Sequence, residues 1–155
     1  MLPELFRRYL SAYGPATLTD AAWFFGLQKD RKKELFVLNM DEYSRFEHDK
    51  GVYYYIDDNA NMGDIPVLTL LSGFDPLIVS YIDRSAVLSP EYKKAVVMSS
   101  GICLPTIAVN GQVMGLWNIK KGEPTVELLT TQPKRIKDAA FELADRVCWQ
   151  TRERL

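Results

Sequence analysis

The sequence has 155 residues, of which 47% are hydrophobic and 25% charged, the composition of an ordinary globular protein with one large or two small domains. No apolar run approaches about 18 residues and no basic-then-apolar leader opens the chain, so we expect neither a membrane span nor a secretory signal. The net charge of −1 gives no overall attraction to nucleic acid, and any binding to DNA would require a local patch.

Three helices are predicted at the amino-terminal end. Apolar residues recur at helical spacing over Leu2 to Leu10. A second helix should begin with Thr19 as its N-cap and Asp20 in its first turn, and close at Gly26. A third helix is expected over about 29–38, with its apolar side chains available for the core.

The hydrophobic period then changes to that of strands. Two short strands are expected over 42–47 and 52–56, joined by a turn at His48-Asp49-Lys50-Gly51. Three helices followed by a β-hairpin is the winged-helix arrangement, in which the third helix enters the DNA groove and the hairpin is the wing. We therefore predict a winged helix-turn-helix domain over residues 1–60.

A polar, turn-rich stretch at 57–64 marks the expected domain boundary. Beyond it, Asn110-Gly111 lies between two apolar runs and tolerates the positive φ of a type I′ hairpin turn. The other elements expected are a strand over 66–71, a helix over about 89–98 with Ser89 as its N-cap, a turn at 120–124, a strand over 125–130 and a helix over 133–152. This pattern predicts an α+β chain whose residues 61–155 form a small β-barrel-like domain with a C-terminal helix.

Candidate DNA contacts gather at the start of the third helix and on the wing. They are Gln28, Lys29, Arg31, Lys32 and Lys33, with His48 and Lys50 on the hairpin. The alternative is a solvated helix face, because Asp30 and Glu34 are interleaved with the cations. Residues 1–62 hold 8 Lys and Arg against 10 Asp and Glu, a net charge of −2, which does not favour DNA.

Asp75, Asp83 and Arg84 raise the possibility of paired carboxylates for acid–base chemistry. Phe74-Asp75-Pro76 also suits an Asp-initiated turn, and the neighbours Asp83 and Arg84 suit a local ion pair or a backbone-bonding corner. The structural interpretation is the better supported of the two.

The remaining reactive residue types form no recognisable site. The sequence has two cysteines, Cys103 and Cys148, and one histidine, without metal-type spacing, so we expect buried, reduced thiols in a cytoplasmic protein. The aromatic runs 23–25 and 53–55 could stack on bases, but core packing explains them more simply. No Gly-rich phosphate loop or Ser/His/Asp arrangement is visible, and we expect no catalytic residue, metal or cofactor.

Several blocks of sequence occur in an order that resembles a known family. They include Tyr13-Gly14-Pro15-Ala16, Phe25-Gly26-Leu27, Phe74-Asp75-Pro76, Tyr81-Ile82-Asp83-Arg84-Ser85, Leu104-Pro105-Thr106 and the run from Val109 to Trp117. Together they resemble the winged-helix DNA-binding-domain family that includes the AlkZ-like DNA glycosylases, which unhook interstrand crosslinks. The resemblance covers nearly all of this chain.

The resemblance implies association with DNA, with a barrel packed against a winged helix. Family members are typically more than twice as long, and this chain resembles only their carboxy-terminal winged helix and barrel. In the characterised glycosylases an upstream winged helix supplies a Gln-hydrophobic-Gln motif that positions the attacking water. The glutamines here are Gln28, Gln112, Gln132 and Gln150, and no two have that spacing.

From these features we predict a protein that binds double-stranded DNA and is not itself an enzyme. One alternative is a DNA glycosylase component that acts on alkylated or crosslinked DNA together with a partner. Another alternative is a winged-helix module for protein–protein interaction. Whether the protein forms a homodimer or binds a partner protein is left open.

Overall fold

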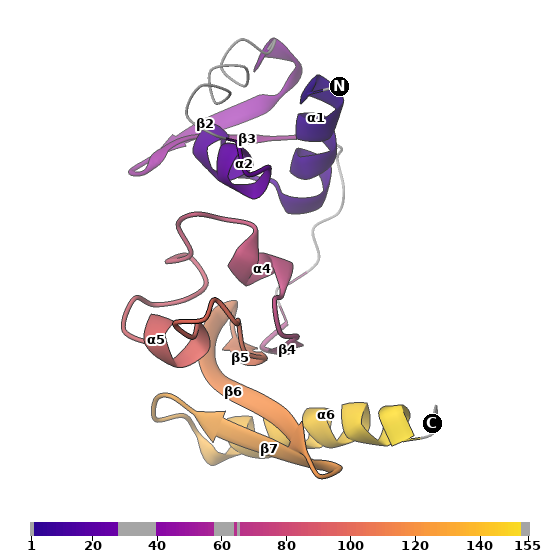
Figure 1. Ribbon diagram of the computed structural model, residues 1–155. Coiled ribbons are helices and arrows are strands. Elements are labelled where there is room, and N and C mark those ends of the chain that lie inside the picture. The colour runs from indigo at the N-terminus through magenta and orange to yellow at the C-terminus, as the bar shows by residue number, and fades with distance from the viewer. Residues whose placement is uncertain (1, 28–39, 58–63, 65, 153–155) are drawn as a thin grey trace. The chain divides into compact units, whose positions relative to one another are not determined.

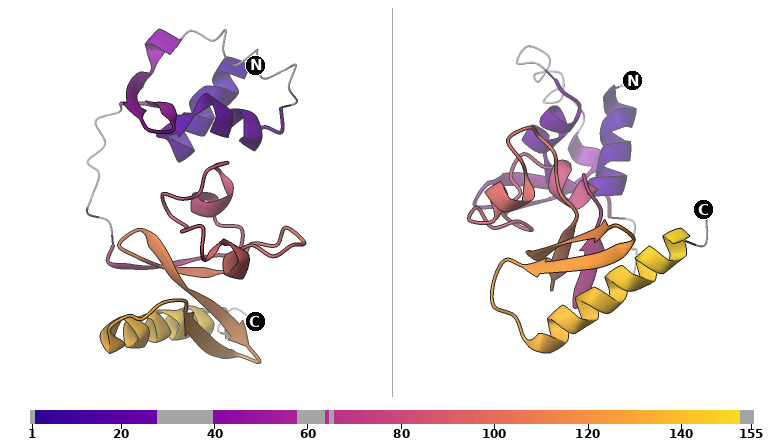
Figure 2. Two further views of the ribbon diagram at one scale, coloured as in Figure 1. Left: turned by 90° about the vertical axis from the view of Figure 1, so that its left-hand side faces the viewer. Right: turned by 60° about the horizontal axis from the view of Figure 1, so that its bottom comes forward.

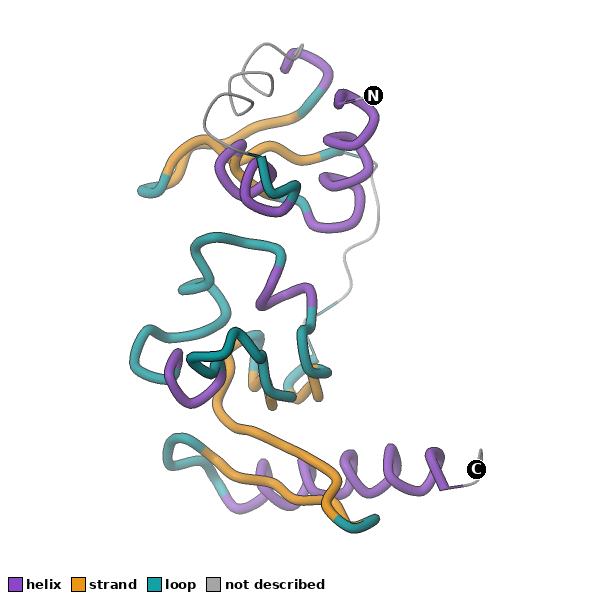
Figure 3. The backbone as a smooth tube through the Cα atoms, in the orientation of Figure 1, coloured by secondary structure: helices purple, strands orange, loops and turns teal. Residues whose placement is uncertain are grey.

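The computed structural model describes residues 2–27, 40–57, 64 and 66–152 (Figure 1). Its helices and two antiparallel sheets confirm the predicted α+β class (Figure 3). The chain divides into two compact units. The first consists of Met1–Gly63 with Val79–Asp83, and the second of Asp64–Ile78 with Arg84–Leu155.

The first unit combines two helices with a three-stranded antiparallel sheet. Its elements are α1 (Leu2–Tyr13), β1 (Ala16–Thr17), α2 (Leu18–Phe24), a 3-10 turn η1 (Met40–Glu42), β2 (Ser44–His48) and β3 (Gly51–Tyr55). The strand order is β1-β3-β2, so the short strand between the two helices pairs with the hairpin. The third predicted helix falls on residues 28–39, outside the described residues.

Helix α2 begins two residues earlier than the sequence predicted, because Thr17 and not Thr19 is the N-cap. Thr17 has an extended backbone, and its hydroxyl accepts a hydrogen bond from the Asp20 amide at 3.1 Å. The Asp20 carboxylate in turn accepts from the Thr17 amide at 3.0 Å, which completes a capping box. At the other end, Gly26 has a φ of +61°, in agreement with the predicted end of the helix.

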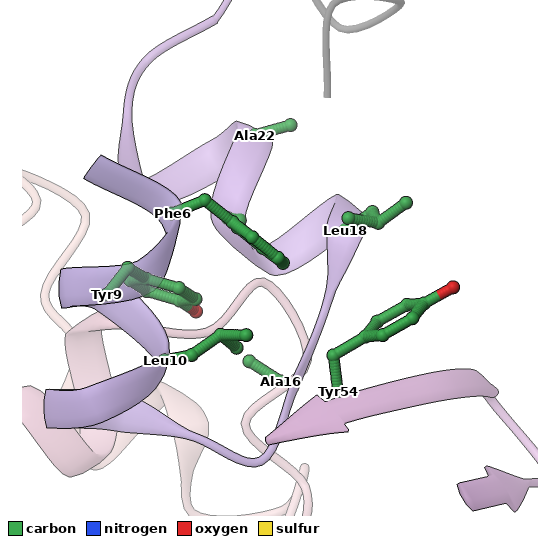
Figure 4. Packing of buried hydrophobic residues seen from close by; sticks show 8 residues of the cluster. Phe6, Tyr9, Leu10, Ala16, Leu18, Ala22 and Tyr54 are labelled. Carbon is green, nitrogen blue, oxygen red and sulfur yellow. The ribbon is translucent and has the colours of Figure 1, made fainter. Parts of the chain in front are cut away.

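The hydrophobic core of the first unit lies between the two helices and the sheet (Figure 4). The buried residues are Phe6, Tyr9 and Leu10 from α1, Ala16 from β1, Leu18, Ala21 and Ala22 from α2, and Tyr54 from β3. The ring of Phe6 lies edge-on to those of Tyr43 and Tyr54, with ring centroids 5.2 Å and 6.5 Å away. The core thus joins the hairpin to the helices.

The segment Val79–Asp83 belongs to the first unit although it is distant in sequence. The buried Tyr9 hydroxyl donates a hydrogen bond to the Ser80 carbonyl at 3.0 Å. The Tyr81 hydroxyl donates to the Tyr13 carbonyl at 2.6 Å. These two bonds attach the segment to helix α1 at Tyr9 and at Tyr13.

Asp20 provides a third attachment for the same segment. Its side chain is buried, and its second carboxylate oxygen accepts a hydrogen bond from the Ile82 amide at 2.9 Å. The first oxygen is occupied by the amide and hydroxyl of Thr17, at 3.0 and 2.7 Å. A buried carboxylate that accepts three hydrogen bonds is well compensated for its loss of water.

The second unit contains a four-stranded antiparallel sheet. Its elements are β4 (Leu68–Leu71), α4 (Pro76–Val79, whose last residue belongs to the first unit), α5 (Lys93–Val96), β5 (Thr106–Val109), β6 (Gln112–Lys120), β7 (Glu123–Leu128) and α6 (Lys134–Arg152). The strand order is β4-β5-β6-β7. In the described residues this sheet is open, with β4 and β7 as its edges, and is not the closed barrel that a barrel-like domain suggests.

The predicted hairpin at Asn110-Gly111 is confirmed. Asn110 and Gly111 have φ values of +49° and +80°, and they connect β5 to β6. Farther along β6, Gly115 lies so close to β7 that an added Cβ would be 2.7 Å from the Glu127 carbonyl oxygen. A side chain is therefore excluded at this point of the sheet.

The long helix α6 covers one face of the sheet (Figure 2). It starts at Lys134, one residue after the predicted start, and contacts β4, β6 and β7. Its inward face carries Ile136, Ala140, Ala144 and Cys148, all buried. These four side chains pack the helix against the sheet.

Two predicted elements of the second unit are wrong in extent. Helix α5 covers four residues instead of ten, because Ser89 and Pro90 form successive turns whose carbonyls accept from the Tyr92 and Lys93 amides. The Ser89 hydroxyl bonds Glu91, and so it does not cap a helix. Strand β7 begins at Glu123 and includes Pro124, which an edge strand tolerates because the missing N–H can face solvent.

Replacing Asp20 with alanine should destabilise the first unit by about 2–4 kcal/mol, because the helix cap and the acceptor for the Ile82 amide are both lost. Urea denaturation followed by circular dichroism measures the change. Asp138→Ala, at an exposed position of α6, is the matched control and should have little effect. Equal stability changes in the two variants would contradict this assignment.

The first unit should also lose stability in alkaline solution. Burial raises the pKa values of Tyr9, Tyr43 and Tyr81 above the ordinary value. Their contribution is complete below the unfolded-state pKa of about 10 and is lost as the pH rises from there through the folded-state values. We expect Tyr81→Phe to flatten the decline in unfolding free energy between about pH 9 and 11, and an unchanged slope would refute the expectation.

Candidate nucleic-acid interface

The hairpin of β2 and β3 forms the described part of the predicted DNA-binding surface. The strands pair from Ser44 opposite Tyr55 to His48 opposite Gly51, and the turn lies at Asp49 and Lys50. Gly51 has a φ of +133°, a conformation that side chains rarely adopt. His48 is exposed at the tip, and its contact with a DNA backbone stays a prediction.

Lys50 forms an ion pair within the first unit. Its ammonium nitrogen lies 2.5 Å from a carboxylate oxygen of Asp83. The hydrogen bond to Asp83 raises the pKa of Lys50, so the side chain is charged at neutral pH. Any phosphate that binds Lys50 would compete with Asp83 or share the cation with it.

The other predicted DNA contacts are Gln28, Lys29, Arg31, Lys32 and Lys33. All five lie outside the described residues. Their role therefore stays a prediction from the sequence.

Asp75 has a local structural role. Its side chain accepts hydrogen bonds from the Leu77 amide at 3.1 Å and, more weakly, from the Ser72 amide at 3.4 Å. These bonds fix the turn that leads into α4, as the Asp-initiated turn requires. Phe74, immediately before it, has a φ of +57° and donates its amide to the Cys103 carbonyl at 3.2 Å.

Asp83 and Arg84 lie at the junction between the two units in the sequence. Asp83 belongs to the first unit, where it pairs with Lys50, and Arg84 begins a stretch of the second. The Arg84 carbonyl accepts from the amides of Val87 and Leu88 at 2.9 and 2.7 Å, which makes a tight corner. The contacts of Asp75 and Asp83 thus give each carboxylate a structural function, and these contacts do not join the two as an acid–base pair.

Both cysteines are buried and free, as the sequence predicted. Burial raises the pKa of the Cys103 thiol, which keeps it protonated and unreactive at neutral pH. The Cys148 thiol donates to the Gly122 carbonyl at 3.0 Å, next to the turn between β6 and β7. Neither thiol resembles a nucleophile.

The aromatic runs 23–25 and 53–55 are only partly buried, whereas the sequence analysis expected core packing to explain them. Of the run at 53–55, only Tyr54 is buried in the core, whereas Tyr53 and Tyr55 point to the other face of the hairpin. Trp23 and Phe24 in α2 are also partly exposed. Core packing therefore accounts for only part of these runs.

Phe46 is a surface residue that the sequence reasoning missed. It pairs with Tyr53 across the hairpin, and the two rings are stacked with centroids 5.3 Å apart. The signal was the strand period of two, which puts Phe46 and His48 on one face once the turn at Asp49 and Lys50 fixes the register.

The second unit has a small pocket of about 240 Å³ on the sheet. Its lining includes Pro105, Trp117, Lys120 and Glu127, from the loop before β5 and from strands β6 and β7. Among the residues that the structure describes, no three His, Cys, Asp or Glu side chains gather as a metal site would need. No helix in the same residues is long and apolar enough to cross a membrane.

Comparison with known proteins finds matches that cover 80% and 94% of this chain. An interstrand DNA cross-link repair glycosylase of Streptomyces sahachiroi is 27% identical over 132 residues, which are 80% of this chain and 36% of the relative. The solved structure of the S. sahachiroi DNA glycosylase AlkZ matches 94% of this chain and 42% of that one, with a TM-score of 0.74 and 25% identity. This chain therefore spans less than half the length of either.

The family model for AlkZ-like DNA glycosylases matches residues 1–148. The match includes α1, both sheets and most of α6, and so it covers both units. The chain belongs to the AlkZ-like DNA glycosylase family.

Proposed function

We propose that this chain binds double-stranded DNA through a winged helix at residues 1–60 and does not excise a base by itself. Residues 61–155 would form a second domain that supports this one. The observation that carries the proposal is the pairing of β1 with β3. Family membership supplies the link to DNA repair.

The pairing of β1 with β3 supports the winged-helix interpretation. β1 lies between α1 and α2, and its residues Ala16 and Thr17 pair with Tyr54 and Tyr53. This pairing joins the hairpin to the segment between the helices through backbone hydrogen bonds, so the hairpin is anchored there. A wing that contacts DNA beside a helix in the groove must be anchored in this way.

The contacts of three carboxylates are structural, which supports a role without excision by this chain alone. Asp20 is buried under three hydrogen bonds, Asp75 caps a turn, and Asp83 pairs with Lys50. The four glutamines lack the Gln-x-Gln spacing that the family resemblance associates with catalysis.

A second candidate is a glycosylase component completed by a partner. It is favoured by the similarity to the interstrand DNA cross-link repair glycosylase of S. sahachiroi, of which this chain matches 36%. In that case a partner protein would supply the glutamines. A role in protein–protein interaction is the third candidate, and the net charge of −2 over residues 1–62 is compatible with it.

The triple replacement of Arg31, Lys32 and Lys33 with alanine tests the proposal. Each lost phosphate contact should reduce the slope of log affinity against log salt by about 1 and weaken duplex binding at low salt. Fluorescence anisotropy with a short labelled duplex at several salt concentrations measures both quantities.

The matched control removes three exposed cations from the first turns of α6: Lys134, Arg135 and Lys137, each replaced with alanine. Because both triple variants lose the same charge, a general electrostatic effect would appear in both. The variant lacking Arg31, Lys32 and Lys33 could instead match the wild type in both affinity and salt slope. That result would exclude the predicted third helix as the DNA contact.

A further inference from the structure

We propose that the outer face of the β2–β3 hairpin is a platform on which unpaired nucleobases stack. This inference rests on the proposed DNA binding and adds a substrate class, DNA with bases out of the duplex. The face is formed by four residues, which we call the aromatic row: Phe46, His48, Tyr53 and Tyr55.

The register of the hairpin puts the aromatic row on one face. Phe46 lies opposite Tyr53, and Tyr55 and His48 occupy the flanking positions of the same face. The Phe46 and Tyr53 rings are nearly parallel, at 7° and 5.3 Å between centroids. The His48 ring stands edge-on to Tyr53 at 6.2 Å, and the Tyr55 ring is tilted against Phe46 at 6.2 Å.

The exposure of the row contrasts with the opposite face of the same hairpin. Phe46 is 43% exposed, whereas Tyr54, which points into the core, is 9% exposed. The fold therefore leaves apolar ring surface in water at the hairpin while it buries the neighbouring tyrosine. Stacking another flat π-system on that surface would remove it from water, which is energetically favourable.

The chemistry of the row favours a nucleobase over a protein partner. No member of the row carries a carboxylate, and Glu47 points to the opposite face because it pairs with Val52. The tyrosine hydroxyls can donate hydrogen bonds to a sugar–phosphate backbone. The Lys50 ammonium lies at the turn, where it pairs with Asp83 and could be shared with a phosphate. Aromatic rings beside donors of this kind are the usual platform for single-stranded nucleic acid.

Binding to an unpaired base is also consistent with membership of a DNA glycosylase family. Enzymes that act chemically on a base must take it out of the stack, because the reacting atoms are inaccessible inside a duplex. A surface that holds unpaired bases would stabilise DNA in which pairing is locally disrupted. The interior of a duplex presents no free base face for a ring to stack on, so duplex binding should not depend on the ring of Phe46.

The test compares labelled oligo-deoxythymidine with a blunt duplex of the same length, by anisotropy at one low salt concentration. We expect Phe46→Ala to weaken binding of the single strand roughly 5- to 100-fold, the range for one lost base–aromatic stack. Binding of the duplex should stay within about twofold of the wild type.

Three further variants control for folding and for general surface effects. Phe46→Leu keeps an apolar side chain without a π face and should lose single-strand affinity as Phe46→Ala does. Phe46→Trp should retain the affinity, and oligonucleotide should quench the added tryptophan fluorescence relative to the wild type. Phe141→Ala removes a phenylalanine of similar exposure, 48% against 43%, from α6 and should change neither affinity.

The outcomes separate the two proposals. Wild-type affinity for the single strand in Phe46→Leu, with duplex binding intact, would overturn the platform and leave the proposed function standing. An absence of binding to both DNAs by the wild-type protein would overturn the proposed function and the platform with it. A loss of duplex affinity equal to the loss of single-strand affinity would show that Phe46 has no selective role for unpaired bases.

Discussion

The buried carboxylate of Asp20 is the interaction on which the first unit depends. One of its oxygens closes the capping box at the start of α2, and the other accepts the Ile82 amide from a segment 62 residues farther along the chain. A carboxylate taken out of water is stable only while its hydrogen bonds are made. The helix start and the position of the segment Val79–Asp83 are therefore coupled through one side chain.

This coupling extends to the hairpin that we propose as the DNA-binding wing. Asp83, at the end of the same segment, pairs with Lys50 at the hairpin turn, and the two tyrosine hydroxyls hold the segment against α1. The block Tyr81-Ile82-Asp83 thus serves the first unit, although the chain has already contributed β4 and α4 to the second. These acidic and aromatic side chains could suggest a catalytic site, but their contacts show a structural role.

Local signals were sufficient for much of the fold. The Asn110-Gly111 turn, the His48 to Gly51 turn and the amphipathic helices α1 and α6 follow from short-range patterns, and the structure agrees with them. Thr17 and Thr19 are both good N-caps, so only the geometry shows which one Asp20 selects. The bonds from Asp20 to Ile82 and from Tyr81 to Tyr13 join residues more than 60 positions apart, which no local pattern can predict. The aromatic row required the hairpin register as well as the alternation of its strands.

DNA association without base excision is tested most directly on one substrate. The chain would be incubated with a labelled duplex that carries a single alkylated base, at a low and a high salt concentration, and both binding and release of that base would be measured. We expect binding that weakens steeply with salt, because phosphate contacts supply most of the affinity, and no released base. An absence of binding at low salt would contradict the DNA-binding role, and release of the base would show that the chain is itself a glycosylase.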